Sequence, residues 1–228
     1  MKYTTLLMDA DDTIFDFPKC EYNALQEALT SCGFPFDDSI HAAFSAINSA
    51  LWKQFEMNRI TRAELRVERF RSLLRECFQD LSSPNTVADR YVEALSKQAI
   101  FIDGAKEAVQ TLSKHFDIFI ITNGLKAVQK GRFARAGLDD CLKGLFISDE
   151  MGVQKPMKAF FDRVMTYIPE KESDRILVVG DSLTSDMQGG RNAGLDTCLY
   201  DPHHKTTLPH PLWDYRIERL TELLSLSE

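Results

Sequence analysis

The chain contains two kinds of hydrophobic pattern, which divide it into an α/β part and a helical part. Residues 3–8 form a short run that predicts a β-strand and ends in three apolar residues. Between residues 17 and 98, apolar residues recur three and four positions apart in four successive segments, which predict amphipathic helices. Chain breakers at 33–35 (GFP) and 82–84 (SSP) separate some of these segments. Four helices in succession favour a helical bundle.

From about residue 103 onward, helical segments alternate with short apolar strands. The predicted strands are 117–122 (DIFIIT), 145–148 (LFIS), 175–181 (RILVVGD) and 195–201 (LDTCLYD). Strands separated by helices are typical of a parallel sheet with helices on both faces. The strand at 3–8 has no partner unless it joins this sheet. We therefore predict an α/β fold with a Rossmann-like core, residues 1–16 and 99–228, and an all-α four-helix cap domain, residues 17–98, inserted after the first strand.

The composition indicates which kinds of partner and which cellular compartment to expect. A formal net charge of -7 disfavours a nucleic-acid polymer as partner, because duplex binding needs clustered Lys and Arg to neutralise phosphates. Five scattered cysteines, none in a CxxC pair, indicate reduced thiols and neither a disulfide framework nor a zinc site. No apolar stretch reaches the about 18 residues of a membrane helix. We expect a cytoplasmic protein without a membrane partner, either a monomer or a homodimer.

A concentration of negative charge follows the first predicted strand. The stretch LLMDADDTIF, residues 6–15, passes from an apolar run into three carboxylates, Asp9, Asp11 and Asp12. Carboxylates this close repel one another and raise each other's pKa. Positive charge is therefore expected at this strand end.

Polar residues also follow other predicted strands. They are Thr122, Asn123 and Gly124 after the run DIFII, and Asp181 and Asp186 after the run RILVVG. Lys155 is expected in an extended loop before a helix, since Pro156 disfavours helix at the residue before it and suits a first helical turn. Because ligands of an open parallel sheet bind at the carboxyl ends of its strands, we expect these side chains to converge. Carboxylates with a nearby phosphate are the ligands that Mg²⁺ prefers, so the pattern predicts a magnesium site for a phosphate monoester.

The motifs DxDxT, a strand ending in TNG, KP, and GDSLTSD occur in this order and resemble those of the haloacid dehalogenase superfamily, in the branch with a helical cap after the first strand. The resemblance covers nearly the whole chain. It implies a Mg²⁺-dependent phosphatase in which Asp9 is the nucleophile of an aspartyl-phosphate. It also implies that Asp11 is general acid and then general base, as dehalogenase members lack this second Asp. Asp12 departs from the pattern, since many relatives have Gly there.

The resemblance implies roles for the remaining motif residues as well. Thr122, Asn123, Gly124 and Lys155 would bind the phosphoryl group, and Mg²⁺ would be held by Asp9, the main-chain carbonyl of Asp11, Asp181 and Asp186. In this arrangement the lysine and the polar groups would stabilise the charge on the phosphoryl oxygens, and the metal would neutralise the carboxylates.

A narrower resemblance lies in the predicted cap. Residues 47–74, together with DADDT, are similar to the pyrimidine 5'-nucleotidase subfamily, which implies a nucleoside monophosphate as the small phosphorylated partner. A sugar-phosphate or phosphoglycolate phosphatase, a phosphomutase, and a non-catalytic binding module remain alternatives. Phe17 and Trp52 are candidate substrate contacts, although aromatic residues at helical spacing are more often part of a core.

Overall fold

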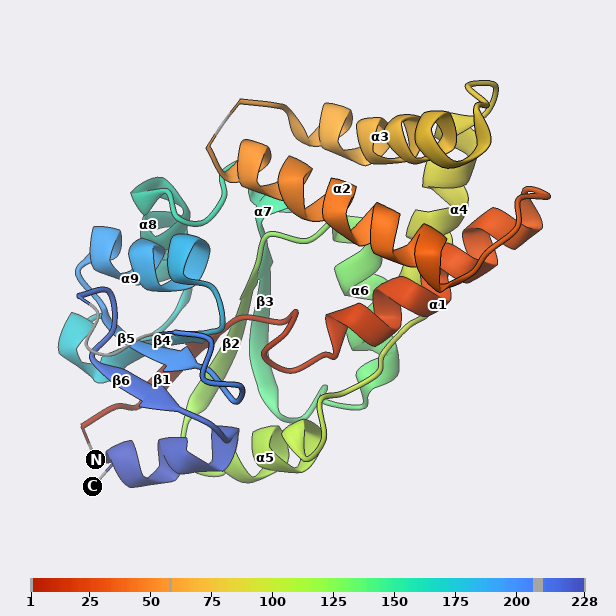
Figure 1. The fold of residues 1–228 in the computed structure, drawn as a ribbon. Helices are drawn as coiled ribbons and strands as arrows, with labels where there is room; N and C mark the ends of the chain where they lie inside the picture. The colour runs from red at the N-terminus through yellow and green to blue at the C-terminus, as the bar shows by residue number, and fades with distance from the viewer. Residues whose placement is uncertain (1, 58, 207–210, 228) are drawn as a thin grey trace. The chain divides into compact units, whose positions relative to one another are not determined.

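The computed structural model describes residues 2–57, 59–206 and 211–227, which form two compact units. One unit comprises Met1–Phe17 and Ala99–Glu228, and the other comprises Pro18–Gln98. We refer to them as the α/β unit and the helical unit. Figure 1 shows both along the chain. Across the described ranges, no helix combines the length and hydrophobicity needed to span a bilayer.

The α/β unit is built on a six-stranded sheet in which every pairing is parallel. Its strands are β1 (Thr5–Met8), β2 (Asp117–Thr122), β3 (Leu142–Ile147), β4 (Ile176–Gly180), β5 (Asp196–Tyr200) and β6 (Tyr215–Ile217). Their order is β3-β2-β1-β4-β5-β6, the doubly wound order in which the winding direction reverses at β1. This confirms the predicted Rossmann-like sheet. The short strand β6 was not predicted from the sequence.

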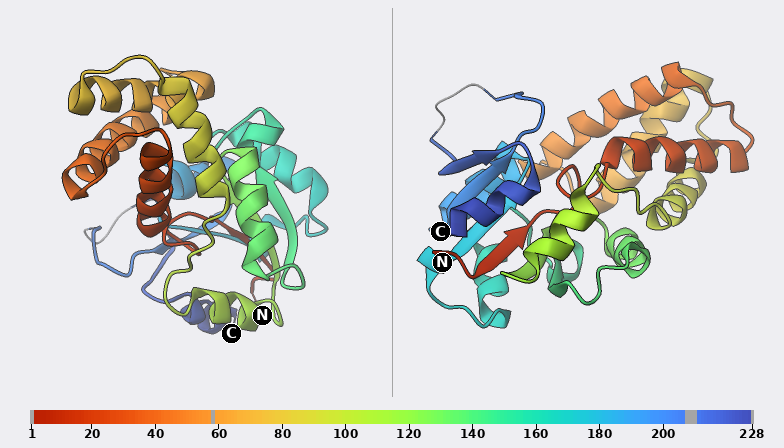
Figure 2. Two further views of the ribbon diagram at one scale, coloured as in Figure 1. Left: turned by 90° about the vertical axis from the view of Figure 1, so that its right-hand side faces the viewer. Right: turned by 90° about the horizontal axis from the view of Figure 1, so that it is seen from below.

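Two hydrophobic layers cover the two faces of this sheet. Successive residues of a strand point to opposite faces, so Leu6 and Met8 pack in one layer while Leu7 packs in the other. The α-helices of this unit are α5 (Ala105–Leu112), α6 (Lys126–Ala136), α7 (Ser148–Met151), α8 (Lys158–Tyr167) and α9 (Gln188–Ala193). The 3-10 helices η2 (Ser173–Arg175) and η4 (Leu220–Ser227) and the π-helical turn η3 (Leu183–Met187) accompany them. Helices α5 and α6 pack on the Leu6 side and α8 on the Leu7 side (Figures 1 and 2). Because both faces are buried, the central strands β1, β2 and β4 are mostly apolar along their length.

The chain leaves and re-enters the α/β unit through two paired segments. Phe15 and Phe101 form an isolated antiparallel bridge. The backbone N–H of Ile102 donates to the carbonyl of Ile14 at 3.0 Å, and that of Asp16 to the carbonyl of Ile100 at 2.9 Å. These bonds bring the ends of the insertion together beside the end of β1, so about eighty residues can be inserted without disturbing the sheet.

The helical unit contains α1 (Phe17–Ser31, whose first residue belongs to the α/β unit), α2 (Asp38–Glu56), α3 (Arg62–Leu73) with the π-helical turn η1 (Leu74–Phe78), and α4 (Pro84–Ser96). Local signals set the helix starts. Asp37 caps α2, Thr61 and Glu64 form a capping box at α3, and Pro84 begins α4, where its missing N–H is tolerated. The predicted all-α insertion with four helices is confirmed.

A buried polar network runs through this helical unit. The amide of Asn48 donates to the carboxylate of Glu21 at 2.7 Å and accepts from the guanidinium of Arg69 at 3.2 Å. The Arg69 guanidinium also lies over the rings of Tyr91 and Phe70, at 4.7 and 5.2 Å from the ring centres. Burial lowers the pKa of Arg69, because it disfavours the charged guanidinium. The hydrogen bond to Asn48 and the cation–π contacts offset part of the free-energy cost of burying this charge.

Candidate active site

The site begins at the carboxyl end of the central strand β1. The backbone N–H of Asp9 donates to the carbonyl of Val179 at 2.8 Å, so the pairing of β1 with β4 extends to Asp9. The chain then turns sharply, because the carbonyl of Ala10 accepts from both Ile14 and Phe15. Asp9 therefore lies between the ends of β1 and β4, where the sheet changes winding direction and ligands of this sheet type bind.

Asp12 occupies the left-handed region of backbone conformation in this turn, with φ of 59°. Glycine adopts that region without strain, and Asp tolerates it better than most other residues. The Asp12 N–H donates to the carbonyl of Phe15 at 2.9 Å, which closes the turn. An Asp at this position is thus compatible with a closed turn. Burial raises the pKa of Asp12 to about 6, and the charge of Asp11 adds to the effect.

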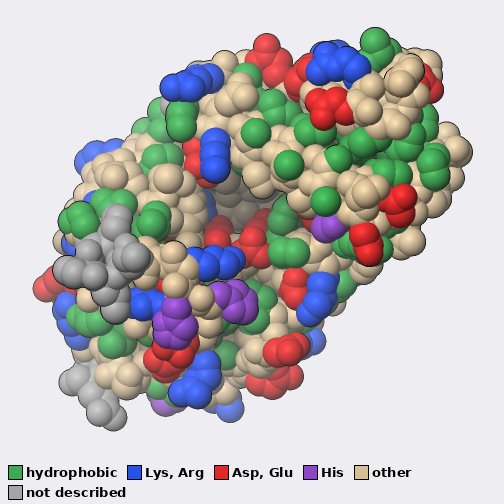
Figure 3. Space-filling model, viewed as in Figure 1, with side chains coloured by type: hydrophobic (Ala, Val, Ile, Leu, Met, Phe, Trp, Pro, Cys, Tyr) green, Lys and Arg blue, Asp and Glu red, His purple; other side chains and the backbone are tan. Residues whose placement is uncertain are grey.

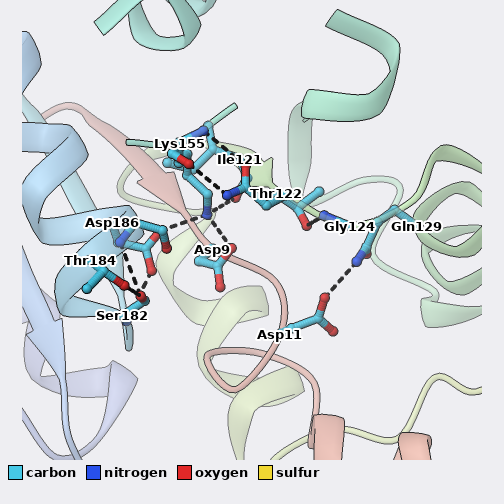
Figure 4. Close-up of polar contacts among 12 residues, drawn as sticks. Asp9, Asp11, Ile121, Thr122, Gly124, Gln129, Lys155, Ser182, Thr184 and Asp186 are labelled. Carbon is cyan, nitrogen blue, oxygen red and sulfur yellow. Dashed lines mark hydrogen bonds and ion pairs between the residues drawn. The ribbon is translucent and has the colours of Figure 1, made fainter. Parts of the chain in front are cut away.

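Lys155 reaches the same place from the loop before α8. Its side chain is 1% exposed, and its Nζ donates to Asp9 Oδ1 at 2.5 Å, to Asp186 Oδ1 at 2.7 Å and to the carbonyl of Ile121 at 2.9 Å (Figure 4). The inward direction agrees with the sequence prediction. Pro156, however, lies before α8 rather than in its first turn, because the turn closed by the N–H of Met157 on the carbonyl of Gln154 comes first.

Asn123 fixes the backbone of this lysine. Its Nδ2 donates to the carbonyl of Lys155 at 2.9 Å, and its Oδ1 accepts from the N–H of Lys155 at 3.0 Å. Beside it, Thr122 Oγ1 accepts from the N–H of Gly124 at 3.0 Å, which shapes the loop after β2. A positioning role for the Asn123 side chain therefore stands beside the predicted role in phosphate binding.

Asp181 and Asp186 complete an acidic cluster after β4. Carboxylate oxygens of Asp9, Asp181 and Asp186 all lie within 4.8 Å of one another. Asp186 is fully buried in the turn η3, and its Oδ2 accepts from the N–H of Ser182 at 3.2 Å. The structure thus brings together the three carboxylates predicted from two distant parts of the sequence.

The cluster has more negative than positive groups, and burial and mutual repulsion raise the pKa of its carboxylates. Burial raises the pKa of Asp9 to about 8; Lys155 opposes the rise, while Asp186 and Asp11 add to it. Burial likewise raises the pKa of Asp181 well above its usual range, and the charge of Asp9 contributes. Burial acts to lower the pKa of Lys155, but Asp186 and Asp9 outweigh it and the pKa is raised. Three carboxylates facing one ammonium fit a divalent cation that prefers oxygen ligands, as Mg²⁺ does.

Asp11 lies on the other side of Asp9 and is held by helix α6. Its Oδ2 accepts from Gln129 Nε2 at 2.7 Å, and its Oδ1 forms an ion pair with the guanidinium of Arg132. Neither α6 residue was identified from the sequence. A signal was present, however, because Gln129 and Arg132 share the buried stripe of α6 with Phe133. Polar residues on a stripe that faces the core need partners, and here the partner is Asp11.

The two candidate substrate contacts have different surroundings. Phe17 is half-buried at the start of α1, and its N–H hydrogen-bonds the Asp12 carboxylate. Trp52 packs in the helical unit against the apolar cluster of Leu51, Phe55 and Leu65, with its ring edge-on to Phe55 at 5.5 Å. Trp52 is only partly buried at the edge of this cluster, so its role as a substrate contact stays a prediction.

The sheet order, the aspartate at the end of β1 with its buried lysine, and the acidic pair after β4 define a class of hydrolase. The chain belongs to the haloacid dehalogenase-like hydrolase family, whose profile matches residues 3–194. It is 37% identical over 222 residues to the HAD-hydrolase YfnB of Bacillus subtilis, covering 97% of this chain and 94% of that protein.

Two of the similar proteins are named as pyrimidine 5'-nucleotidases. The chain is 36% identical to the pyrimidine 5'-nucleotidase PynA of Streptococcus pneumoniae over 205 residues, covering 90% of this chain and 86% of PynA. It is 32% identical to the pyrimidine 5'-nucleotidase YjjG of Escherichia coli over 205 residues, covering 90% and 89%. Among solved structures, that of YfnB bound to magnesium, described as revealing interdomain movement, matches with a TM-score of 0.92 over 99% of each chain.

Proposed function

We propose that this protein is a Mg²⁺-dependent phosphatase that hydrolyses nucleoside 5'-monophosphates, pyrimidine nucleotides above all. The observation that carries the proposal is the buried Asp9, held by Lys155 at the sheet switch point beside two further carboxylates. Its substrate class rests on the similarity to two pyrimidine 5'-nucleotidases. Acidic and basic side chains are interspersed over the face drawn in Figure 3, which suits a small phosphorylated substrate better than a nucleic-acid polymer.

In the first step the Asp9 carboxylate attacks the phosphorus, forming a P–O bond to Asp9 while the bond from phosphorus to the ester oxygen breaks. Asp11 gives its proton to the departing oxygen, so the nucleoside leaves as a neutral alcohol. Lys155 and the N–H groups of the loop after β2 offset charge on the phosphoryl oxygens.

In the second step Asp11, now a carboxylate, takes a proton from water as that water attacks the phosphorus of the aspartyl-phosphate. The bond between Asp9 and phosphorus breaks, and inorganic phosphate and the Asp9 carboxylate are regenerated. Asp9, Asp181, Asp186 and the main-chain carbonyl of Asp11 would hold Mg²⁺, which supplies positive charge that keeps the carboxylates ionised and attracts the phosphate.

The test is phosphate release, with Mg²⁺, from UMP, dUMP, dTMP, CMP, AMP, GMP, glucose 6-phosphate and phosphoglycolate. We expect kcat/KM for pyrimidine monophosphates at least about tenfold above that for the others, equivalent to about 1.4 kcal/mol of transition-state discrimination. Asp9→Asn should reduce release to background, because an amide cannot attack phosphorus. Asp12→Asn is the matched control, since Asn tolerates the left-handed backbone at position 12.

Each result bears on a different part of the proposal. A folded, Mg²⁺-loaded protein that hydrolyses no monoester would favour a binding module over an enzyme. Activity centred on sugar phosphates or phosphoglycolate would keep Asp9 as nucleophile but reject the nucleotide substrate. Transfer of phosphate to a second sugar position without steady release would indicate a phosphomutase.

A further inference from the structure

Both oxygens of the Asp11 carboxylate are held by one helix that is distant in sequence. Gln129 Nε2 donates to Oδ2 at 2.7 Å, and the Arg132 guanidinium pairs with Oδ1. The two donors are separated by three positions on α6, so they lie on the same face of the helix. Figure 4 shows the Asp11 carboxylate pointing toward Gln129.

Gln129 is placed at an energetic cost. Its side chain is 1% exposed, and its Oε1 is buried with no hydrogen-bond partner in the described part of the chain. An unpaired buried carbonyl destabilises the fold, whereas an apolar residue of similar size would avoid the loss. The stability of α6 therefore does not account for a glutamine at position 129. The hydrogen bond from Gln129 to Asp11 does.

Arg132 is held rigidly on the same face. Its side chain is fully buried, and its guanidinium lies 4.3 Å from the centre of the Phe15 ring. A guanidinium stacked on an aromatic ring and enclosed by the core has few alternative orientations. It can therefore fix the orientation of the carboxylate with which it pairs.

The loop after β2 makes room for this contact. A Cβ atom at Gly124 would lie 2.3 Å from Gln129 Nε2, closer than side-chain carbons approach other atoms. The bare backbone of Gly124 thus lets the Gln129 amide lie against the loop and reach Asp11. The phosphate-binding loop and the acid-base residue are linked through one buried amide.

We propose that Gln129 and Arg132 are positioning residues that hold the carboxyl group of Asp11 in the orientation needed for proton transfer to the leaving oxygen. The inference rests on the proposed function and goes beyond it by naming two residues outside the proposed nucleophile, phosphate-binding and metal-binding sets. Proton transfer in a transition state requires a donor fixed within hydrogen-bond reach. A carboxylate without these partners samples several side-chain orientations, most of which do not meet the leaving group.

The test compares two leaving groups in one series of variants. The ribose oxygen of UMP is a poor leaving group that needs a proton, whereas p-nitrophenyl phosphate releases a stable phenolate and needs little help. The comparison uses kcat/KM, which reports the steps up to formation of the aspartyl-phosphate and is unaffected by its later hydrolysis. Gln129→Met keeps the length of the side chain but removes the N–H donor. We expect kcat/KM for UMP to fall about 10- to 100-fold, against less than about threefold for p-nitrophenyl phosphate.

Further variants connect this effect to Asp11. Asp11→Asn should show the same selective loss with UMP, to a larger extent, and adding Gln129→Met to Asp11→Asn should cause no additional selective loss. Arg132→Lys, which keeps the charge but loses the planar pair of donors, should resemble Gln129→Met. Arg135→Gln is the matched control, because Arg135 is exposed on the same helix and should leave both kcat/KM values unchanged. Circular dichroism and the melting temperature would verify that each variant is folded.

The outcomes separate the inference from the proposed function. Equal losses with both substrates in folded Gln129→Met would indicate a merely structural role and overturn the inference, as would unchanged or increased activity toward UMP. If the unaltered protein hydrolyses no phosphate monoester, the proposed function itself fails. If it is active but the ratio of the two kcat/KM values is constant across the series, only the positioning role fails.

Discussion

Gly180, the last residue of β4, lies where the Asp186 side chain fills the space that a larger residue would need. A Cβ atom at position 180 would lie 2.3 Å from Asp186 Oδ2 and 2.4 Å from its Cγ. Asp186 cannot move freely, because Lys155 holds one of its oxygens and the N–H of Ser182 holds the other. Gly180→Ala should therefore displace a side chain of the proposed metal site by adding a single methyl group.

The magnitude follows from the contacts that must change. Relieving the overlap requires a movement of about 1 Å, which takes the Lys155–Asp186 contact of 2.7 Å beyond hydrogen-bond distance. Overpacking costs about 1–3 kcal/mol, and losing a charge-assisted hydrogen bond costs about 1.5–3 kcal/mol. The lower entropy of the unfolded alanine chain offsets about 0.4–1 kcal/mol. We expect a net loss of about 2–5 kcal/mol, or roughly 5–20 °C in melting temperature.

The assay is thermal unfolding with and without Mg²⁺. Metal binding should raise the melting temperature of the unaltered protein and have a much smaller effect on Gly180→Ala. Gly190→Ala is the matched control, because a Cβ there would lie 2.4 Å from Thr197 Cγ2, away from the carboxylates. Gly190→Ala should lower the unfolding free energy by about 1–2 kcal/mol but keep the rise in melting temperature on adding Mg²⁺. If Gly180→Ala retains both the stability and the Mg²⁺ response of the unaltered protein, the reasoning from this contact is wrong.

Three more predictions concern the charges of the two units. Lys155→Met should abolish turnover and destabilise the metal-free protein by about 3–5 kcal/mol, because Asp9 and Asp186 lose their shared ammonium. Chemical denaturation at several Mg²⁺ concentrations would show this loss of unfolding free energy becoming smaller as metal binds. Since the folded-state pKa of Asp9 is raised to about 8 from an ordinary value near 4, the metal-free protein should lose stability as pH rises between these values, and the stabilisation by Mg²⁺ should grow over the same range. Asn48→Leu should destabilise the helical unit by about 3–5 kcal/mol, because Glu21 and the buried guanidinium of α3 lose their common partner; amide hydrogen exchange in that unit would measure the loss.

Specific results would contradict these expectations. For Lys155→Met, a deficit that is independent of Mg²⁺ would mean that the metal does not replace the lost positive charge. For the pH series, a Mg²⁺ effect that is constant from pH 5 to 9 would show that the carboxylates are already ionised without metal. For Asn48→Leu, a change within about 0.5 kcal/mol would show that the network is energetically unimportant.

Much of the fold follows from local patterns. Short runs of four to seven mostly apolar residues predicted five parallel strands, and these occur in the sheet together with a sixth. Strand β6 escaped prediction because only three residues form it, in a segment rich in polar and turn-forming residues. Strand β3 begins at Leu142, three residues before the predicted start, because Leu142 and Gly144 pair with Ile118 and Phe119 across a register shift at Lys143. Lys143 and Gly144 interrupt the apolar pattern.

The residues of the candidate site were predictable for a similar reason. Asp9 and Asp181 directly follow a recognisable strand and Thr122 ends one, and a parallel sheet brings such strand ends to one edge. The predicted convergence required only that β1, β2 and β4 be neighbours, which they are. The catalytic roles of these residues stay predictions until the substrate and variant assays are done.

The sequence by itself determined the class of fold, the family and the set of acidic residues with one lysine, because strand ends and helix faces are set by nearest neighbours along the chain. Only the tertiary structure decided how these groups are held. Gln129 lies 118 positions from Asp11, and Asn123 lies 32 positions from the lysine whose backbone it fixes. Such contacts depend on the packing of α6 and the loops against the sheet. Hydrophobic periodicity specifies which face of a helix is buried but not which polar group a buried side chain will meet.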